Sequence, residues 1–231
     1  MIAITFALPE ESRDFAGSLR HPGVTGAPSC EALLGNTGAG ECLLFHTGMG
    51  QARARERVAR LLREHPVKRL ISAGYAGGLD PALAAGSLFL ARNYSDSRWL
   101  AQAQAALKGR ARIGVLATAP NVLETRDEKA RFARQTGADA VDMETAAIHA
   151  LCLEHGVPML SLRVISDPAG EELTVPFSVC FDAVTERPRP AALLGFLLRN
   201  PSRVTGFIQF ALRMSRVRGV LTDALLRVVD R

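Results

Sequence analysis

The sequence has few cysteines, and none is placed as a zinc site or a disulfide framework would require. Cys30, Cys42, Cys152 and Cys180 are scattered without CxxC or CxxH spacing, so we expect neither a metal centre nor a disulfide-stapled fold. The N-terminal segment lacks the basic leader of a signal peptide. No apolar run approaches the ~20 residues that a membrane-spanning helix needs. We therefore expect a cytoplasmic protein with reduced thiols.

Two signatures of nucleotide and nucleic-acid binding are also missing. The glycine-rich segments "HTGMGQ" and "GYAGG" do not match GxGxxG, which leaves a dinucleotide-binding fold with little support. The arginines of 51–64 are not interleaved with aromatic residues, so we expect a solvated helix face there and no nucleic-acid partner.

The pattern that is present predicts an α/β fold. The chain has 231 residues, 48% of them hydrophobic, which is enough for one domain with a sizeable core. Short apolar runs alternate with helical patterns. Strands are expected at 2–8, 42–46, 69–73, 87–91, 112–117 and 158–165, and helices at 51–64, 97–107, 126–136 and 144–155. This alternation indicates helices on both faces of a largely parallel sheet.

Acidic side chains lie near the ends of several predicted strands, where ligands of such sheets bind. Glu11 follows the first strand, Asp142 and Glu144 begin a predicted helix, and Asp167 ends the last strand. Each acid alone has an ordinary explanation as a helix cap or as a partner of the helix dipole. Any functional meaning therefore depends on the joint pattern.

That joint pattern resembles the nucleoside phosphorylase and nucleosidase superfamily (purine nucleoside phosphorylase type 1). The blocks "GMG", "SAGYAGGL", "VDMETAAI" and "RVISD" follow the family's order over residues 1 to about 172. The resemblance implies a three-layer α/β/α sandwich with a central mixed, twisted sheet, and cleavage of the bond between ribose and a purine, here adenine. Acids suit that reaction because positive charge develops on the sugar and negative charge on the base.

Residues that match the family's motifs receive roles by this resemblance. Asp167 corresponds to the acid at the purine N7, and Glu11 to the acid that activates water in the hydrolases. Glu144 corresponds to the acceptor of the ribose hydroxyls, a task that suits a carboxylate. The other substrate-binding residues would be Met143, packed on the ribose, with Tyr75, Ala76, Gly77, Ser166 and Asp142, the last chiefly as a helix cap.

The sequence departs from the methylthioadenosine/S-adenosylhomocysteine nucleosidases at Tyr75, where they carry serine, and at Gly170, where they often carry an acid. The segments "AGGLDPALAAGSL" and "LLRNPSRVTGFIQFALR" are more similar to the hopanoid-associated phosphorylases, which release adenine from an adenosylated lipid. We expect an enzyme that releases adenine from a nucleoside with a modified 5′ substituent, with a lipid-linked one among the candidates. A nucleosidase-like hydrolase and a nucleoside-binding protein without turnover are the alternatives.

The nucleophile stays open at this level. No cofactor is expected, but phosphate is a candidate co-substrate, since Gly48, Met49, Gly50 and Arg53 begin a helix whose amides could hold a dianion. Glu11 would repel that dianion and suits water instead. Phosphorolysis and hydrolysis both remain possible.

The positive charge is concentrated at the C-terminal end. From residue 187 onward, nine arginines face two aspartates, a net +7 against +5 for the whole chain, which leaves −2 for residues 1–186. We expect a nucleoside phosphorylase-like domain over 1–186 and, packed on it, a basic amphipathic extension over 187–231 with helices at 191–199 and 202–229. Its apolar stripe would cover the domain, meet a second subunit in the homodimer that the family implies, or touch the inner membrane face as a peripheral contact.

Overall fold

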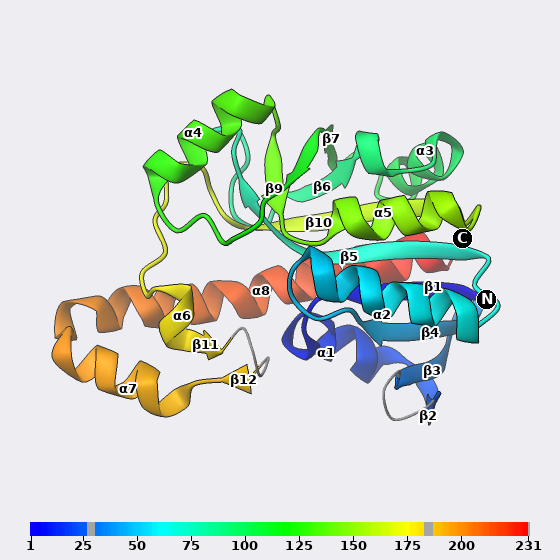
Figure 1. Cartoon of the computed structure of the whole chain (residues 1–231), viewed down its shortest axis with the longest axis horizontal. Coiled ribbons are helices and arrows are strands. Elements are labelled where there is room, and N and C mark those ends of the chain that lie inside the picture. The colour runs from blue at the N-terminus through cyan, green and yellow to red at the C-terminus, as the bar shows by residue number, and fades with distance from the viewer. Residues whose placement is uncertain (27–30, 183–186, 231) are drawn as a thin grey trace.

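A mixed ten-stranded sheet with helices on both faces forms the body of the molecule (Figure 1). The computed structural model describes residues 1–26, 31–182 and 187–230. The main sheet contains β1 (Ile2–Phe6), β2 (Arg20–Thr25), β3 (Ala32–Thr37), β4 (Gly40–His46), β5 (Arg69–Gly78), β6 (Leu88–Ala91), β7 (Arg112–Gly114), β8 (Leu116–Thr118), β9 (Ala140–Asp142) and β10 (Met159–Asp167). A second, two-stranded sheet pairs β11 (Phe181–Asp182) with β12 (Arg187–Pro188). The predicted α/β/α sandwich is confirmed.

The helices are α1 (Pro9–Ser18), α2 (Gln51–Glu64), α3 (Ser97–Ala106), α4 (Arg126–Thr136), α5 (Thr145–Glu154), α6 (Phe177–Cys180), α7 (Pro190–Arg199) and α8 (Val204–Val229), with 3₁₀ turns η2 (Arg92–Tyr94) and η3 (Pro201–Arg203). The predicted helices at 51–64 and 126–136 have the observed bounds. Within the described residues, no helix combines the length and apolarity needed to span a bilayer.

The centre of the sheet is parallel, which places one end of four strands at the same edge. The strand order is β2-β3-β4-β1-β5-β10-β6-β7, with β9 added beside β5 and β8 beside β9. β4, β1, β5 and β10 run parallel to one another. Their carboxyl ends therefore form one edge, where an open α/β sheet binds its ligands.

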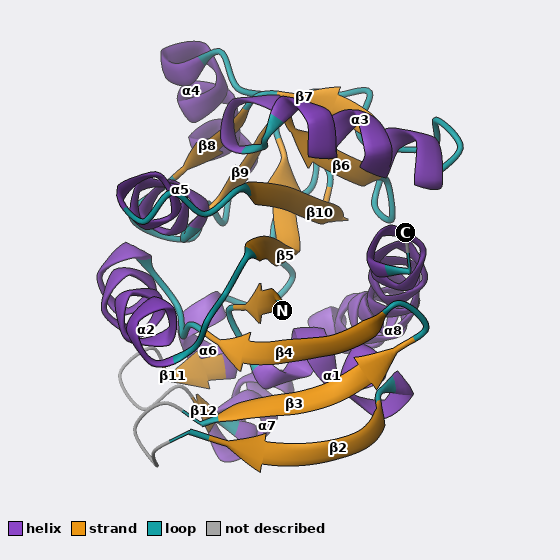
Figure 2. Ribbon diagram, turned by 90° about the vertical axis from the view of Figure 1, so that its right-hand side faces the viewer, coloured by secondary structure: helices purple, strands orange, loops and turns teal. Residues whose placement is uncertain are grey.

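Each face of the sheet is covered by helices whose apolar residues repeat with helical spacing (Figure 2). On one face, Ala54, Val58 and Leu61 of α2 are fully buried against the strands and α5. On the other, α1, α3 and the C-terminal half of α8 cover the sheet, and Val217, Leu221 and similarly spaced residues of α8 enter the largest core cluster. These i, i+3, i+4 and i+7 positions form the apolar stripe of an amphipathic helix.

Strand β5 is longer than the sequence indicates. It continues through "GYAGG", beyond the expected strand at 69–73, because this segment is paired on both sides: Ala76 aligns with Ile165 of β10 and Gly77 with Val141 of β9. The expected strand at 112–117 is divided into β7 and β8. The β2–β3 hairpin was not predicted, because its exposed β2 residues lack the alternation of a half-buried strand.

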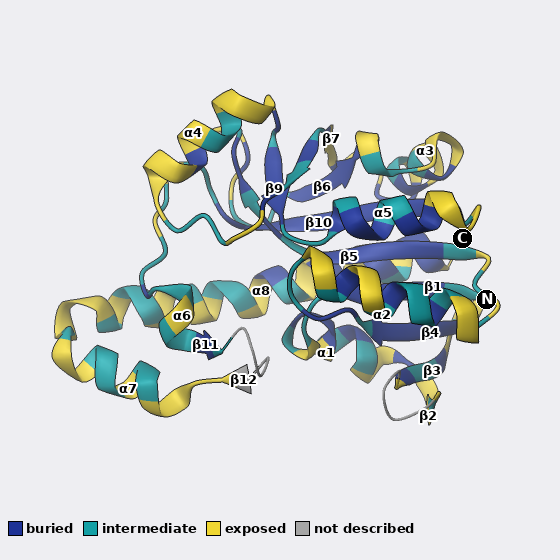
Figure 3. Ribbon diagram, in the orientation of Figure 1, coloured by how far each residue is buried: buried dark blue, intermediate teal, exposed yellow. Residues whose placement is uncertain are grey.

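The helices of the C-terminal extension form where they were predicted, but their stripe is only partly buried (Figure 3). The expected domain boundary between residues 186 and 187 borders on residues 183–186, which lie outside the described part of the chain. Cys30 lies outside it as well. Figure 1 shows α7 and the N-terminal half of α8 beyond the carboxyl edge of the sheet. Large apolar side chains are exposed there: Leu194 (60%), Leu198 (74%), Ile208 (52%) and Leu212 (57%).

Candidate active site

Glu11 is held by three backbone amides at the carboxyl edge of the sheet. It lies in the first turn of α1, directly after β1, and only 8% of it is exposed. Its carboxylate accepts hydrogen bonds from the backbone amides of Ala7 (2.9 Å), Leu8 (3.2 Å) and Tyr75 (3.1 Å). Burial raises the pKa of Glu11, and these amides oppose the shift. A buried carboxylate with a raised pKa is a stronger base than an exposed one, which suits it to accept a proton from water.

Gly74 makes this placement possible. A Cβ atom at this position would lie 3.2 Å from one Glu11 carboxylate oxygen and 3.4 Å from the other. A side chain at this position would crowd the Glu11 carboxylate, so glycine favours the close approach of β5 to the acid.

Glu144 faces the same small cavity from the start of α5. The cavity has a volume of about 10 Å³ and is lined by Glu11, Glu144, Thr47, Ser72 and Arg163, with the backbone of the β1 and β5 ends. Glu144 accepts a hydrogen bond from the Gly50 amide at 2.7 Å. Burial, followed by the nearby Asp142 carboxylate, raises the pKa of Glu144 to about 8. Two acids from different elements therefore share one cavity.

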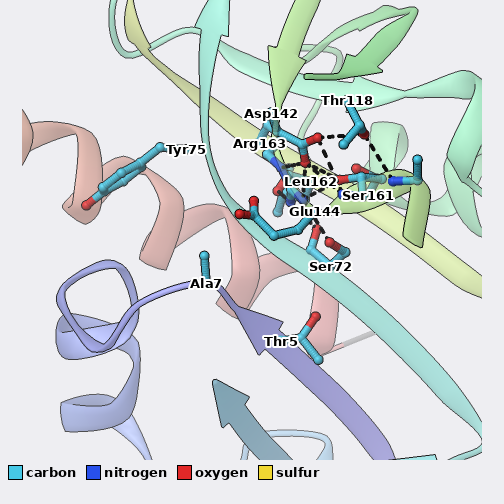
Figure 4. Close-up of polar contacts among 12 residues, drawn as sticks. Thr5, Ala7, Ser72, Tyr75, Thr118, Asp142, Glu144, Ser161, Leu162 and Arg163 are labelled. Atoms are coloured by element: carbon cyan, nitrogen blue, oxygen red, sulfur yellow. Dashed lines mark hydrogen bonds and ion pairs between the residues drawn. The ribbon is translucent and has the colours of Figure 1, made fainter. Parts of the chain in front are cut away.

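Asp142 is engaged by the protein itself (Figure 4). Its carboxylate pairs with Arg163 at 2.9 Å, both side chains being almost fully buried. It also accepts hydrogen bonds from the Thr118 hydroxyl (2.9 Å) and the Thr145 amide (3.2 Å), and from the Thr145 hydroxyl. Asp142 thus satisfies the first amide of α5, although the residue at the N-cap position of this helix is Glu144 and not Asp142. With these partners the Asp142 carboxylate points into the protein interior. Its contacts with Thr145 stabilise the start of α5, directly after Glu144.

Tyr75 contributes to the cavity through its backbone. Its amide donates to Glu11, whereas its ring points away from Glu144 and packs on the core cluster that includes α8 (Figure 4). Burial and the nearby Glu11 raise the pKa of the Tyr75 phenol. The structure therefore shows the Tyr75 amide, and not its ring, in contact with Glu11.

Asp167 ends β10, four residues beyond Arg163, and is 9% exposed. It accepts a hydrogen bond from the Ser166 hydroxyl, which also donates to the Ala76 carbonyl at 3.2 Å. The Lys129 ammonium lies 2.5 Å from its other oxygen. Burial raises the pKa of Asp167, and Lys129 and Ser166 counteract this. A Cβ atom on Gly77 would lie 3.4 Å from Asp167, so the backbone of β5 approaches this acid closely.

The glycine loop before α2 is already used in part. The Gly48 amide donates to the Ala7 carbonyl at 3.1 Å, and the Gly50 amide donates to Glu144. Two of the amides expected to hold phosphate thus have protein partners. Arg53 lies partly buried in the first turn of α2, and Met49 and Met143 are also partly buried, Met143 between β9 and α5.

Comparison with known proteins places the chain in a family. A family model described as the phosphorylase superfamily matches residues 1–97 and 91–194. The chain belongs to the phosphorylase superfamily. A 5'-methylthioadenosine/S-adenosylhomocysteine nucleosidase of Bacillus cytotoxicus is 26% identical to this superfamily member over 211 residues, 78% of this chain and 91% of the relative.

Solved structures of the same architecture align over almost the whole chain. The Campylobacter jejuni 5'-methylthioadenosine/S-adenosyl homocysteine nucleosidase has a TM-score of 0.76 at 19% identity and covers 99% of this chain and 98% of its own. The futalosine hydrolase of Helicobacter pylori has a TM-score of 0.75 at 17% identity, covering 99% and 97%. At these identities the likeness establishes the fold of this superfamily member.

Sequence reasoning missed two basic residues of the site. Arg163 interrupts the otherwise uncharged stretch "MLSLRVIS", and a charge in a strand buried along its whole length signals an internal ion pair. Lys129 gave no such signal, because "RDEKARFAR" has the composition of a solvated helix. Both residues hold an acid that this phosphorylase superfamily member was predicted to use.

Proposed function

We propose that this protein releases adenine from an adenine nucleoside by hydrolysis of the N-glycosidic bond, with Glu11 activating the attacking water. The observation that carries the proposal is the pair of acids, Glu11 and Glu144, around one cavity at the carboxyl edge of the sheet. The names of the relatives, methylthioadenosine/S-adenosylhomocysteine nucleosidase and futalosine hydrolase, support the same reaction class.

Water suits this cavity better than phosphate does. The volume of about 10 Å³ is close to what one water molecule requires. Arg163, which lines the cavity, is committed to Asp142 and to both the carbonyl and the hydroxyl of Ser72. A phosphate charge ~4 Å from an ionised Glu11 would be repelled by about 4 kcal/mol per unit charge at an intermediate dielectric. Hydrolysis avoids that cost.

The other residues have roles that fit this reaction. Glu144 accepts hydrogen bonds from the ribose hydroxyls. Its ionised form, which predominates above its pKa of about 8 and which a neighbouring positive charge favours, stabilises the positive sugar of the transition state. Asp167 serves the purine N7, since its raised pKa lets it carry a proton. Met143 packs against the ribose, where a thioether adds contact area without competing hydrogen bonds. A 5′ substituent other than a hydroxyl is part of the proposal, and the name of the methylthioadenosine/S-adenosylhomocysteine nucleosidase relative supports it.

The test is product analysis with three nucleosides: methylthioadenosine, S-adenosylhomocysteine and a 5′-alkylated adenosine. Each is incubated with the protein in phosphate buffer and in phosphate-free buffer, and chromatography separates adenine, the free sugar and the sugar 1-phosphate. We expect adenine and free sugar at a rate that phosphate does not change. Formation of the sugar 1-phosphate would show that the reaction is phosphorolysis and not hydrolysis. Calorimetric binding without adenine release would identify a nucleoside-binding protein and contradict the proposal.

A second proposed property is contact with an anionic lipid surface through the helical hairpin, defined as α7, η3 and the N-terminal half of α8. Exposed Leu194, Leu198, Ile208 and Leu212 lie on this hairpin together with exposed Arg199, Arg203 and Arg216. An apolar face beside arginines is typical of helices that lie in a membrane interface. The hairpin also stands beyond the edge that carries the acids, so a nucleoside with an apolar 5′ group could reach the site from that surface (Figure 1).

Vesicle sedimentation tests this property. We expect the protein to sediment at low salt with vesicles of phosphatidylglycerol and phosphatidylcholine but not with phosphatidylcholine alone. Leu198→Asp combined with Ile208→Asp should abolish sedimentation, while the polar exchange Gln209→Ser on the same helix should not. No sedimentation at low salt, together with a dimer in ultracentrifugation that the double variant dissociates, would assign the hairpin to a second copy of the chain instead.

A further inference from the structure

Lys129 is a buried cation outside the set of residues to which the proposed reaction gives a task. It lies in the first turn of α4, and 1% of it is exposed. A lysine is almost never buried to this extent unless it is paired. Its Nζ lies 2.5 Å from Asp167 Oδ2 and donates to the carbonyl oxygens of Pro168 (3.0 Å) and Glu171 (2.9 Å). The three donors of the ammonium group thus meet three acceptors.

The residue type is informative in this chain. The sequence has three lysines, Lys68, Lys108 and Lys129, against 25 arginines. The other two lysines are exposed. Three acceptors that converge on one point suit a compact ammonium group, whereas the planar fork of an arginine presents its donors in one plane and at separate positions. The geometry around Asp167 therefore requires lysine rather than a positive charge alone.

Both oxygens of the Asp167 carboxylate are held on the protein side. Lys129 contacts Oδ2, and the Ser166 hydroxyl donates to Oδ1. The plane of the carboxylate is thereby fixed, and the remaining lone pairs stay available to a ligand, because a carboxylate offers about four acceptor sites.

The same lysine fastens the segment that follows Asp167. Its bonds to Pro168 and Glu171 tie residues 168–171 to α4, and the Glu171 carboxylate is held in turn by Arg213 of α8 with two contacts of 2.7 Å. The charged groups that act on Asp167 are therefore Lys129 from α4, which lowers its pKa, and Glu171 from the following segment, which raises it.

We infer that Lys129 is a positioning residue for the purine-side acid: it fixes the orientation of Asp167 and the 168–171 segment, and it acts through Asp167 without touching the nucleoside. The inference rests on the proposed function for the task of Asp167, but the contacts that carry it are independent of which nucleoside is cleaved. A residue that acts through another should have no effect of its own once the other is removed.

The test compares Lys129→Met with Lys68→Met, the same exchange at an exposed lysine, in wild-type and Asp167→Asn backgrounds. An opposite charge at this distance lowers a carboxyl pKa by about 1 to 3 units. In K129M the pKa of Asp167 should rise. We therefore expect the limb of the kcat/KM pH profile that belongs to Asp167 to move to higher pH by about one unit or more. We expect kcat at neutral pH to fall about tenfold or more, because the acid is no longer held in place. K68M should match the wild type.

The comparison between the wild-type and D167N backgrounds shows whether Lys129 acts through Asp167. In the D167N background, K129M should add less than a twofold loss. A loss that multiplies with D167N, or a folded K129M with the wild-type profile, would overturn the inference. If K129M does not fold, Lys129→Arg serves instead: it keeps the charge, so a fivefold or greater fall in kcat with an unmoved limb supports the inference, and an unchanged kcat overturns it.

Carbon NMR separates this inference from the proposed function. Titration of the ¹³C-labelled Asp167 carboxyl, assigned by its disappearance in D167N, should show a midpoint about one unit or more higher in K129M than in the wild type, and in K129R close to the wild type. This measurement needs no turnover. Wild-type protein that releases no adenine would contradict the proposed function alone, whereas an unmoved midpoint in K129M would overturn the role of Lys129 alone.

Discussion

Replacing Glu11 with glutamine is expected to lower kcat for adenine release by about 10²- to 10⁴-fold, the usual contribution of a general base. Glutamine cannot take a proton from water, although it fills the same space between β1 and β5. The measurement is the initial rate of adenine release from the best nucleoside. In the wild type, activity should be lost as the pH falls through the raised pKa of Glu11, because only the ionised carboxylate can act as a base.

Glu10→Gln is the matched control, since the same exchange is made one residue earlier in the same helix turn. It should leave kcat within twofold of the wild type. Glu11→Gln should also lower the free energy of unfolding by about 1 to 3 kcal/mol, because one of the three amides that face the carboxylate would meet an NH₂ group. An E11Q protein that is folded and retains full turnover would remove Glu11 from the mechanism.

The largest expected effect on stability belongs to Arg163→Met. Arg163 and Asp142 form an ion pair at 2.9 Å with side chains 3% and 2% exposed. Removing one partner leaves the other charge buried, which typically costs about 3 to 5 kcal/mol. We expect the free energy of unfolding from urea denaturation to fall by about that amount.

Arg55→Met provides the comparison. It breaks the ion pair with Glu154 at 3.0 Å, in which the two side chains are 55% and 53% exposed, and exposed pairs contribute about 0 to 1 kcal/mol. The double variant Arg163→Met with Asp142→Asn should be less destabilised than the sum of the two single variants, because no buried charge is left unpaired. Equal losses in R163M and R55M would contradict the structural role given to the buried pair.

The sequence predicted most of the fold because its strands and helices carry their periodicity locally. Helix α2 is an example: Ala54, Val58 and Leu61 repeat with helical spacing, and the helix has the predicted bounds. The extension of β5 could not be predicted in this way. Glycine is depleted in strands, and only pairing with β9 and β10, which are distant in the chain, makes "GYAGG" a strand.

In the candidate site, too, some residues could be predicted from local sequence and others could not. The acids Glu11, Glu144 and Asp167 were predicted because they match the motifs of a known superfamily, and Glu11 and Asp167 also follow predicted strands. Their partners were not found, since the contacts of Lys129 with Asp167 and of Arg163 with Asp142 join residues 38 and 21 positions apart (167 − 129 and 163 − 142). A contact between residues so far apart in the sequence leaves no local sequence pattern. For Tyr75 the sequence did not indicate the direction of the ring, which packs on the core cluster that includes α8.

The placement of α8 has a consequence for synthesis of the chain. The last turns of α8, including Leu225, Val228 and Val229, complete the same core cluster that contains Ile4 and Phe6 of the first strand. A nascent chain on the ribosome therefore leaves this part of the sheet exposed until residues 225–229 emerge, and a chain terminated before them would lack part of its own interior. Strand β1 and the last turns of α8, which are about 220 residues apart in the sequence (225 − 4 = 221), depend on each other for a stable fold.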